Sequence, residues 1–172
     1  MGKTSIINQY LNGTFSTELK SNTGAANSEK IVPIEVNGGK RELKLDIWDT
    51  AGQEIYKAQG MQFYRNANVV IMVFAINNEF SYNEMNEFAD TVDTNCPPDC
   101  IKVLVGNKCD LEQERKIDYA DALDQAKVLN MNKFFETSAT RKETIDQVFA
   151  WIANELASRG RVFNSRNPSI KL

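Results

Sequence analysis

Three short runs of almost continuous apolar residues constrain the fold of this chain more than any other feature. They span residues 69–76, 102–105 and 133–137, and none shows the strict alternation of a strand with one exposed face. Strands that are buried on both faces of a sheet have this pattern. The runs are separated or followed by stretches in which apolar residues have helical spacing, at 79–95, 119–130 and 143–157. The order predicts an α/β fold with a mainly parallel sheet.

A further pair of strands is predicted nearer the N-terminus. Residues 31–37 and 43–48 are rich in β-formers, and Gly38-Gly39 lies between them, which is typical of a hairpin. Open α/β sheets bind their ligands beyond the carboxyl ends of the strands. We therefore expect the chemistry of this chain in the segments that directly follow the predicted strands.

The charge and composition limit the function classes. The chain has 172 residues, of which 42% are hydrophobic and 25% charged, as expected for one globular domain with a sizeable core. A net charge of −3 argues against nucleic acid as the main partner, because that partner needs a concentrated basic face. Residues 159–172 hold four basic residues and no acidic one. We interpret them as a basic C-terminal tail that is either solvated or touches an acidic membrane surface.

Cysteine usage and hydropathy predict a cytosolic chain. The cysteines number three and the histidines none, so Cys96 and Cys100 lack the further ligands of a zinc site. The longest apolar run is far shorter than the ~20 residues that a membrane helix needs. No signal peptide is visible. We expect a cytoplasmic protein, or one bound peripherally to the cytosolic face of a membrane.

A phosphate-binding motif opens the chain. Gly2-Lys3-Thr4-Ser5 precedes a helical segment at 6–11 and matches the end of the loop G-x-x-x-x-G-K-[ST]. A helix start offers free amides to phosphate, Lys3 can reach the outer phosphates, and the Thr4 hydroxyl can ligate Mg²⁺. The alternative is that this short match is an ordinary surface sequence.

The segment after the second predicted strand is more informative. In Asp49-Thr50-Ala51-Gly52-Gln53-Glu54, Asp49 can hold a water bound to the metal and the Gly52 amide can approach the outermost phosphate. Gln53 is the candidate catalytic residue, because it can orient an attacking water. The alternative is a polar turn between a strand and a loop.

Two further motifs follow buried strands. In Asn107-Lys108-Cys109-Asp110, the Asp110 carboxylate can accept two hydrogen bonds from one edge of guanine, and the Lys108 stem can lie over the base. Asn107 can tie neighbouring loops together. In Thr137-Ser138-Ala139, small side chains allow backbone amides to face the guanine carbonyl oxygen. Each motif alone could be an ordinary polar turn.

In this order the motifs G-K-T-S, W-D-T-A-G-Q-E, N-K-C-D and E-T-S-A resemble those of the Ras superfamily of small GTPases. The segments Phe63-Tyr64-Arg65-Asn66-Ala67 and 78–82 resemble its Rab branch. The resemblance implies a P-loop NTPase fold, with a six-stranded sheet flanked by helices, over about residues 1–158. It implies a monomer that binds GTP or GDP with Mg²⁺ and slowly hydrolyses GTP. Exchange factors, GTPase-activating proteins and effectors in vesicle trafficking would be its partners.

The chain departs from this family at the phosphate loop. The family places a central strand before the loop, whereas only Met1 precedes Gly2 here, so the first central strand and the front half of the loop are missing. Loss of a central strand leaves unpaired backbone groups on both of its neighbours. We expect such a chain to fold poorly, and to be either a shortened version of a longer protein or a degenerate one.

The first switch and the C-terminus also depart from the family. In the family, an aromatic residue that flanks the base stands seven positions before a threonine that binds Mg²⁺. Phe15 matches the aromatic residue, but the threonine position then falls on Asn22, and Thr23 stands one residue later. Either residue is a candidate ligand. No cysteine follows Cys109, so the chain as written offers no site for a prenyl anchor.

Three functions remain open. The first is a Rab-type switch that hydrolyses GTP, and the retained Gln53 favours it. The second is a pseudo-GTPase that acts as a binding module, favoured by the incomplete phosphate loop and the altered first switch. The third is an ATP-using P-loop enzyme, which Asp110 disfavours. The charges at 112–116 are expected to form a solvated loop.

Overall fold

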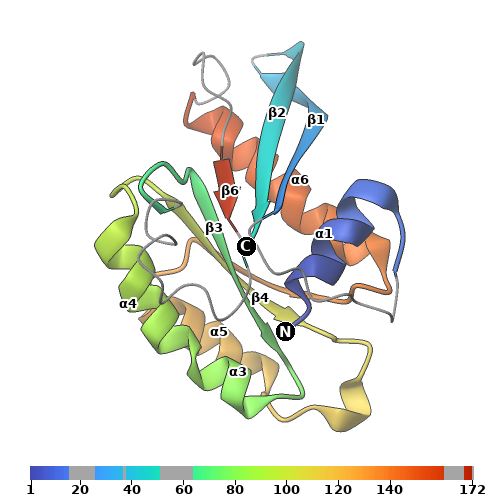
Figure 1. The fold of residues 1–172 in the computed structure, drawn as a ribbon, viewed down its shortest axis with the longest axis vertical. Helices are drawn as coiled ribbons and strands as arrows, with labels where there is room; N and C mark the ends of the chain where they lie inside the picture. The colour runs from blue at the N-terminus through green and yellow to red at the C-terminus, as the bar shows by residue number, and fades with distance from the viewer. Residues whose placement is uncertain (16–25, 37, 51–63, 161–168, 172) are drawn as a thin grey trace.

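The structure is a computed structural model that describes residues 1–15, 26–36, 38–50, 64–160 and 169–171. The described part contains a six-stranded sheet in the order β1-β2-β6-β3-β4-β5, flanked by helices (Figure 1). The strands are β1 (Ala26–Val36), β2 (Gly39–Asp49), β3 (Val69–Ala75), β4 (Ile101–Asn107), β5 (Lys133–Thr137) and β6 (Ser169–Lys171). The helices are α1 (Lys3–Asn12), α3 (Glu79–Asn83), α4 (Met85–Asn95), the 3₁₀ turn η2 (Glu112–Glu114), α5 (Tyr119–Val128) and α6 (Lys142–Ser158).

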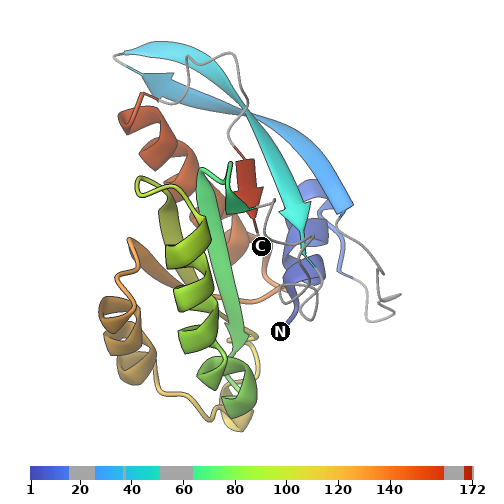
Figure 2. The same ribbon diagram turned by 60° about the vertical axis from the view of Figure 1, so that its left-hand side comes forward.

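The predicted hairpin is confirmed. β1 and β2 pair antiparallel along their whole length, from Ala26 opposite Asp49 to Val36 opposite Gly39. Figure 2 shows the pair as a long twisted ribbon. Burial alternates along the second half of β2, where Leu43, Leu45 and Ile47 are buried. This alternation is the signature of a strand with one face on the core.

Burial on both faces is confirmed for β3 and β4, whereas the prediction is wrong for β5, in which Phe134 and Thr137 are buried but Lys133 is exposed at the edge of the sheet. β3, β4 and β5 are parallel neighbours. Every residue of β3 is buried, and so is every residue of β4 except Lys102. A strand covered by helices on both sides has no solvent-facing set of residues, so its sequence does not alternate.

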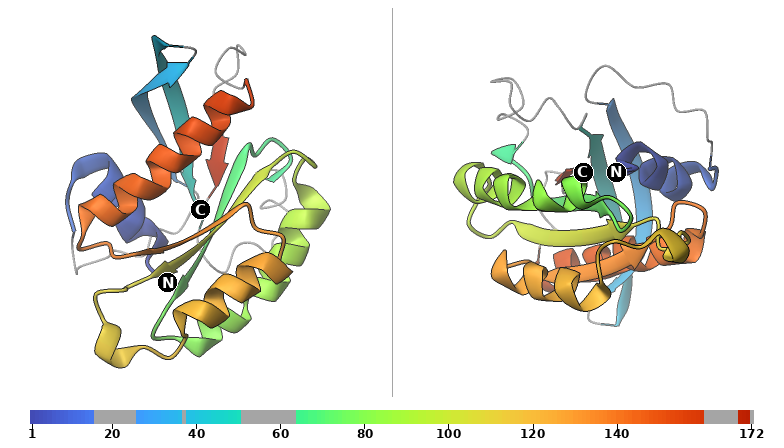
Figure 3. Two further views of the ribbon diagram at one scale, coloured as in Figure 1. Left: turned by 180° about the vertical axis from the view of Figure 1, so that it is seen from behind. Right: turned by 90° about the horizontal axis from the view of Figure 1, so that it is seen from below.

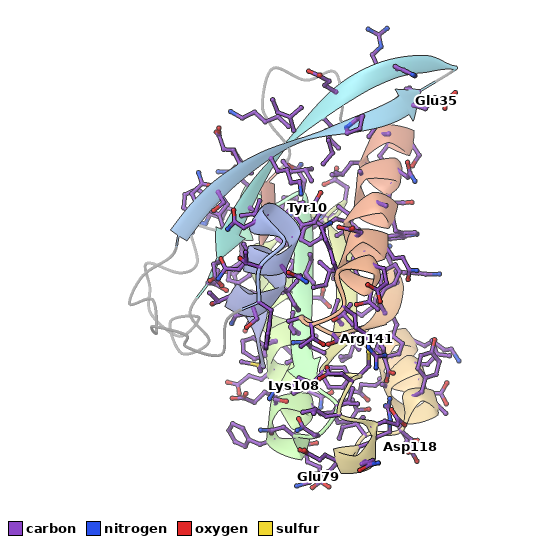
Figure 4. The ribbon with its side chains drawn as sticks, turned by 90° about the vertical axis from the view of Figure 1, so that its right-hand side faces the viewer. Tyr10, Glu35, Glu79, Lys108, Asp118 and Arg141 are labelled. Atoms are coloured by element: carbon purple, nitrogen blue, oxygen red, sulfur yellow. The ribbon has the colours of Figure 1, made fainter. Side chains whose placement is uncertain are left out.

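Two hydrophobic clusters cover the two faces of the sheet. One joins α1 and α6 to the sheet, and the other joins α4 and α5 to it. Figure 3 shows α6 from behind, with α1 beside it. The Tyr10 ring of α1 stacks on Phe149 of α6 at 3.7 Å between centroids, and Figure 4 shows Tyr10 at this junction. The apolar stripe predicted for the last helix is buried: Ile145, Val148, Phe149, Ile152 and Leu156.

The helix predicted over 79–95 is divided into α3 and α4 at Glu84. The division is slight, because Glu84 keeps helical dihedral angles of φ −63° and ψ −18°. Its amide donates to the Phe80 carbonyl, and its carbonyl accepts from the Phe88 amide. The two helices therefore follow one another almost without a break. In the described part of the chain, no helix is long and apolar enough to cross a bilayer.

The C-terminal segment contains a strand that the sequence does not predict. β6 lies between β2 and β3 and runs parallel to both. Ile170, at its centre, is fully buried in the core cluster of α1 and α6. Residues 169–171 of the predicted basic tail thus occupy the central position of the sheet, where the family resemblance indicated a missing strand.

Candidate functional site

The candidate residues gather at one edge of the sheet. β2 ends at Asp49, β4 at Asn107 and β5 at Thr137, and these strands run in the same direction. Their carboxyl ends therefore meet at the same edge. Hydrogen bonds connect the beginning of the chain to this edge, as described below. Figure 4 labels Lys108 there, together with Arg141 just before α6.

The phosphate-loop residues form the start of α1. Gly2 is the N-cap, at φ +95°, and no side chain caps the helix. The first helical hydrogen bond runs from the Ile6 amide to the Gly2 carbonyl at 3.0 Å. The amides at the beginning of such a helix have no partner within it, and they face outward with the positive end of the helix dipole. This arrangement can bind a phosphate group.

Gly2 also approaches a neighbouring loop closely. A Cβ atom at this position would lie 2.5 Å from Nδ2 of Asn107. The left-handed backbone and the close contact each favour glycine here. A glycine is thus required at this end of the motif for two independent physical reasons.

Two of the predicted metal-binding residues, Thr4 and Asp49, are neighbours. The Thr4 hydroxyl donates to Oδ2 of Asp49 at 2.7 Å, and Asp49 is 8% exposed. Burial lowers the pKa of Lys3, although the nearby Asp49 and Glu84 carboxylates act in the opposite direction. Hydroxyl and carboxylate oxygens are the ligands that Mg²⁺ prefers, and Mg²⁺ sites commonly combine few protein ligands with phosphate and water. The residues present therefore fit a magnesium ion held together with a nucleotide.

Asn107 joins the two halves of the candidate site. Its Nδ2 donates to the Met1 carbonyl at 3.0 Å, and its Oδ1 accepts from the Thr137 hydroxyl at 3.2 Å. Asn107 and Thr137 are almost completely buried. A buried amide with both ends hydrogen-bonded has little freedom to rotate. The start of the phosphate segment is thereby held at a fixed position relative to the end of β5.

The segment after β4 is shaped for a base. Lys108 adopts a left-handed backbone at φ +67°, and the next amide, of Cys109, donates to the Thr137 carbonyl at 3.0 Å. The Ser138 hydroxyl donates to Oδ1 of Asp110 at 2.5 Å. Since a carboxylate has about four lone-pair sites, Asp110 keeps acceptor capacity for a ligand.

The turn after β5 leaves a backbone donor available. The Ser138 amide donates to the Thr144 hydroxyl at 3.0 Å, and the Thr140 amide donates to Oγ of Ser138 at 3.1 Å. Between them, the Ala139 amide has no hydrogen-bond partner among the described residues. A free amide at this place suits an acceptor on the edge of a base. Thr144, on the first turn of α6, is a supporting residue that the sequence did not indicate.

The prediction that residues 112–116 form a solvated loop is wrong for Arg115. Its side chain is 14% exposed and makes a bidentate ion pair with Glu136 of β5, with N–O distances of 2.7 and 2.8 Å. It also binds Glu112 and the Ile117 carbonyl. These hydrogen bonds raise the pKa of Arg115, and the hydrogen bond to Glu136 contributes more than the one to Glu112. The i, i+3 spacing to Glu112 was visible in the sequence, but the partner on β5 was not.

The remaining candidates differ in their placement. Ser5 is buried, with 6% exposure, and lies within the first turn of α1. Phe15 lies beyond the end of α1 and is 46% exposed, so its contact with a base stays a prediction. Four candidates lie outside the described residues: Asn22, Thr23, Gly52 and Gln53.

Comparisons with known proteins agree with this arrangement. The family model described as "Ras family" matches residues 1–158. The GTP-binding protein ypt5 of Schizosaccharomyces pombe is 35% identical over 167 residues, which cover 96% of this chain and 77% of the relative. The Ypt/Rab-type GTPase Rab7 of Gibberella zeae is 36% identical over 163 residues, covering 91% and 78%. Ras-related protein Rab-13 of Canis lupus familiaris is 34% identical over 163 residues, covering 94% and 78%.

Proposed function

Because this chain belongs to the Ras family and is a Rab-type GTP-binding switch, we propose that the residues at the carboxyl edge of its sheet bind GTP or GDP together with Mg²⁺. Members of this family hydrolyse GTP, and the chain is a GTPase of the vesicle-trafficking type. Its partners are guanine nucleotide and the general classes of regulators and effectors. We place its action at the cytosolic face of intracellular membranes, and residues 1–158 as its nucleotide-binding domain.

We assign the phosphate and metal roles to the start of α1 and the end of β2. The amides of Gly2, Lys3, Thr4 and Ser5 would surround the phosphates, with the Lys3 ammonium next to them. Thr4 would ligate Mg²⁺ directly and Asp49 through water, since their oxygens already lie 2.7 Å apart. The ion would neutralise charge on the outer phosphates during transfer. Gly52 would hold the outermost phosphate, and Gln53 would position the attacking water.

The base would be read by the segments after β4 and β5. Asp110 would accept two hydrogen bonds from guanine, the Lys108 stem would cover the ring, and Ala139 would donate its amide to the carbonyl oxygen. Adenine offers no such pair of donors on that edge, so this arrangement favours GTP over ATP. Phe15 would flank the base from the other side, and either Thr23 or Asn22 would complete the metal site.

One observation carries the proposal: the Asn107 side chain hydrogen-bonds both Met1 and Thr137. A nucleotide has its phosphates and its base at opposite ends, so a nucleotide site needs both halves at a fixed separation. Asn107 supplies that link between the two. No contact among the described residues favours a binding module without hydrolysis. Thr4 and Asp49 lie together as a magnesium site would require, and Gln53, the candidate for hydrolysis, lies outside the described residues.

The test is a change of base specificity. The Asp110→Asn variant turns one acceptor into a donor, and xanthine presents an acceptor where guanine presents a donor. We expect the variant to lose affinity for GTP by about 100-fold or more while it binds xanthosine triphosphate with nearly unchanged or higher affinity. ATP should compete poorly against both forms.

The matched control is Asp118→Asn, which removes the same charge from an exposed position outside the site. It should leave both affinities unchanged. Equal losses of GTP and xanthosine triphosphate affinity in Asp110→Asn would refute the assignment of Asp110 as the base reader, since equal losses indicate general damage.

A further inference from the structure

We propose that Cys96 and Cys100 form a redox-sensitive dithiol, which hydrogen peroxide converts into an intramolecular disulfide and a thiol reductant restores. The pair lies where α4 ends and β4 begins, in the spacing C-x-x-x-C. Both cysteines are free thiols in the structure. The inference goes beyond the proposed function and does not depend on it.

The backbone brings the two cysteines together at a tight turn. Cys96 is the C-cap of α4, and its amide donates to the Val92 carbonyl at 2.8 Å. The Cys100 amide donates to the Pro97 carbonyl at 3.0 Å, which closes a turn over residues 97–100. Pro98 stands at the second position of this turn, where the fixed φ of proline fits. The two cysteines are thus held on either side of a turn with few alternative conformations.

The side chains of the pair are in contact. Cys100 is 7% exposed and belongs to the hydrophobic cluster that joins α4 and α5 to the sheet, and Cys96 packs against the same cluster. The two thiols also share a hydrogen bond, which lowers the pKa of Cys96. A disulfide requires the sulfur atoms to approach to about 2 Å. The rigid turn keeps them close enough for that approach.

The surroundings give the two thiols different roles. Cys96 is partly exposed, whereas Cys100 is buried. The hydrogen bond from Cys100 has the largest effect on the pKa of Cys96 and outweighs burial, which acts in the opposite direction. Asp93 raises this pKa and Lys102 lowers it, and these two side chains pair with each other at 2.6 Å. Since the thiolate is the reactive form, Cys96 is the thiol that peroxide attacks first, and Cys100 is the resolving thiol.

The reaction runs in two steps. The Cys96 thiolate attacks one oxygen of hydrogen peroxide, so that an S–O bond forms, the O–O bond breaks and hydroxide leaves. The sulfur of Cys100 then attacks the sulfenic acid on Cys96, so that the S–S bond forms and the S–O bond breaks. The second hydroxide leaves with the proton of Cys100 as water. Overall, two thiols lose two electrons and two protons, and the peroxide becomes two molecules of water.

The dithiol lies far from the candidate nucleotide site. β4 begins at Ile101, directly after Cys100, and ends at Asn107. Its seven residues span about 20 Å in an extended conformation. Figure 1 shows the connection from α4 to β4 at the end of the sheet opposite to the tip of the β4 arrow. Disulfides that form in a reducing compartment are usually transient and redox-sensing, and this pair suits such a role.

The first test is mass spectrometry of the unmodified full-length chain after brief exposure to hydrogen peroxide. Trypsin releases Cys96 and Cys100 together in the peptide 66–102, whereas Cys109 falls in the peptide 109–115. We expect the peptide 66–102 to be lighter by two hydrogen atoms and to resist iodoacetamide until dithiothreitol is added. A disulfide to Cys109 or to a second copy would overturn the proposal. So would added oxygen on two thiols that remain unlinked.

The second test assigns the roles of the two thiols. In the reduced chain, iodoacetamide should label Cys96 at least about tenfold faster than Cys100. In the Cys100→Ser variant, peroxide should leave a sulfenic acid on Cys96, which dimedone traps. If this variant does not fold by circular dichroism, Cys100→Ala takes its place under the same criteria. Faster labelling of Cys100, or a folded variant without trapped sulfenic acid, would overturn the assignment.

Cys109→Ser is the matched control, because it removes a thiol outside the pair. It should form the disulfide at a rate within about twofold of the original chain. Loss of the disulfide in this variant would overturn the proposal, since Cys109 would then take part in the reaction. The mass readout needs no nucleotide, so a chain that never binds GDP would refute the proposed function and still test the dithiol.

Discussion

Substitution of Arg115 by methionine tests how the loops around the base are held together. The guanidinium spans the segment after Asp110 and the Glu136 carboxylate on β5, which directly precedes Thr137. Methionine keeps much of the apolar stem but removes every hydrogen bond of the head. Glu136, whose side chain is 15% exposed, would then be left as a nearly buried carboxylate without its bidentate partner.

The expected loss follows from the burial of this pair. Removal of one partner from a fully buried ion pair costs about 3–5 kcal/mol, because the other charge stays buried and unpaired. Both side chains here keep about one-seventh of their exposure, so some solvent screening remains. We therefore expect Arg115→Met to lower the free energy of unfolding by about 2–3 kcal/mol. GDP should also bind several-fold more weakly, since Asp110 and Ser138 lose their common support.

Urea unfolding is the appropriate assay, and the fluorescence of Trp48 and Trp151 reports the transition. Every sample contains the same saturating concentrations of GDP and Mg²⁺. Glu112→Gln is the matched control. Glu112 is 66% exposed, so its pair with Arg115 should contribute nothing measurable. The double variant Arg115→Met, Glu136→Leu removes the orphaned charge and should recover at least about half of the loss. A double variant as unstable as the single one would refute the reasoning, because the loss would then come from packing alone.

Three further predictions concern single residues. Gly2→Ala should weaken GDP binding at least about tenfold, because the added methyl group would clash with Asn107. Gly13→Ala should not weaken it, since Gly13 is also at positive φ but has no atom within 4 Å of the added methyl group. Equal losses in the two variants would show that the clash with Asn107 is not the cause. Gln53→Leu should slow single-turnover GTP hydrolysis while leaving GTP affinity nearly intact; a parallel loss of affinity would indicate a structural role. Burial raises the pKa of Tyr10 to about 12. The neutral phenol therefore stabilises the fold fully below pH ~10, and this contribution declines as the pH rises to about 12. In Tyr10→Phe, the free energy of unfolding should depend less on pH over this range.

The sequence predicts the parts of this fold whose pattern is local. The continuous apolar runs of β3 and β4 identify buried strands, and the stripe from Ile145 to Leu156 identifies the face of α6, because in each case neighbouring residues share one environment. The sequence also predicts where the candidate site lies. A motif placed directly after a parallel strand has to lie at the carboxyl edge of the sheet, and Asp49 and Asn107 do so.

The features that the sequence does not predict depend on contacts between distant segments. Arg115 belongs to a charged stretch that is typical of a solvated loop, and only the arrival of Glu136 from β5 buries it. Ile170 stands alone between polar residues, so neither alternation nor helical spacing marks a strand of three residues there. Its strand character comes from the two neighbouring edges, which impose an extended backbone on whatever segment lies between them.

The contacts that hold the phosphate segment determine how nucleotide binding can be perturbed. The start of α1 is held from the side by two strand ends, by Asn107 at the end of β4 and by Asp49 at the end of β2. β4 is fixed by its pairing with β3 and β5 along its length, whereas β2 is bounded on one side by the three residues of β6. The weaker of the two supports is thus the one that carries the metal-binding carboxylate. Substitutions that loosen the centre of the sheet should consequently reduce magnesium-dependent affinity before they affect the recognition of guanine, which depends on β4 and β5.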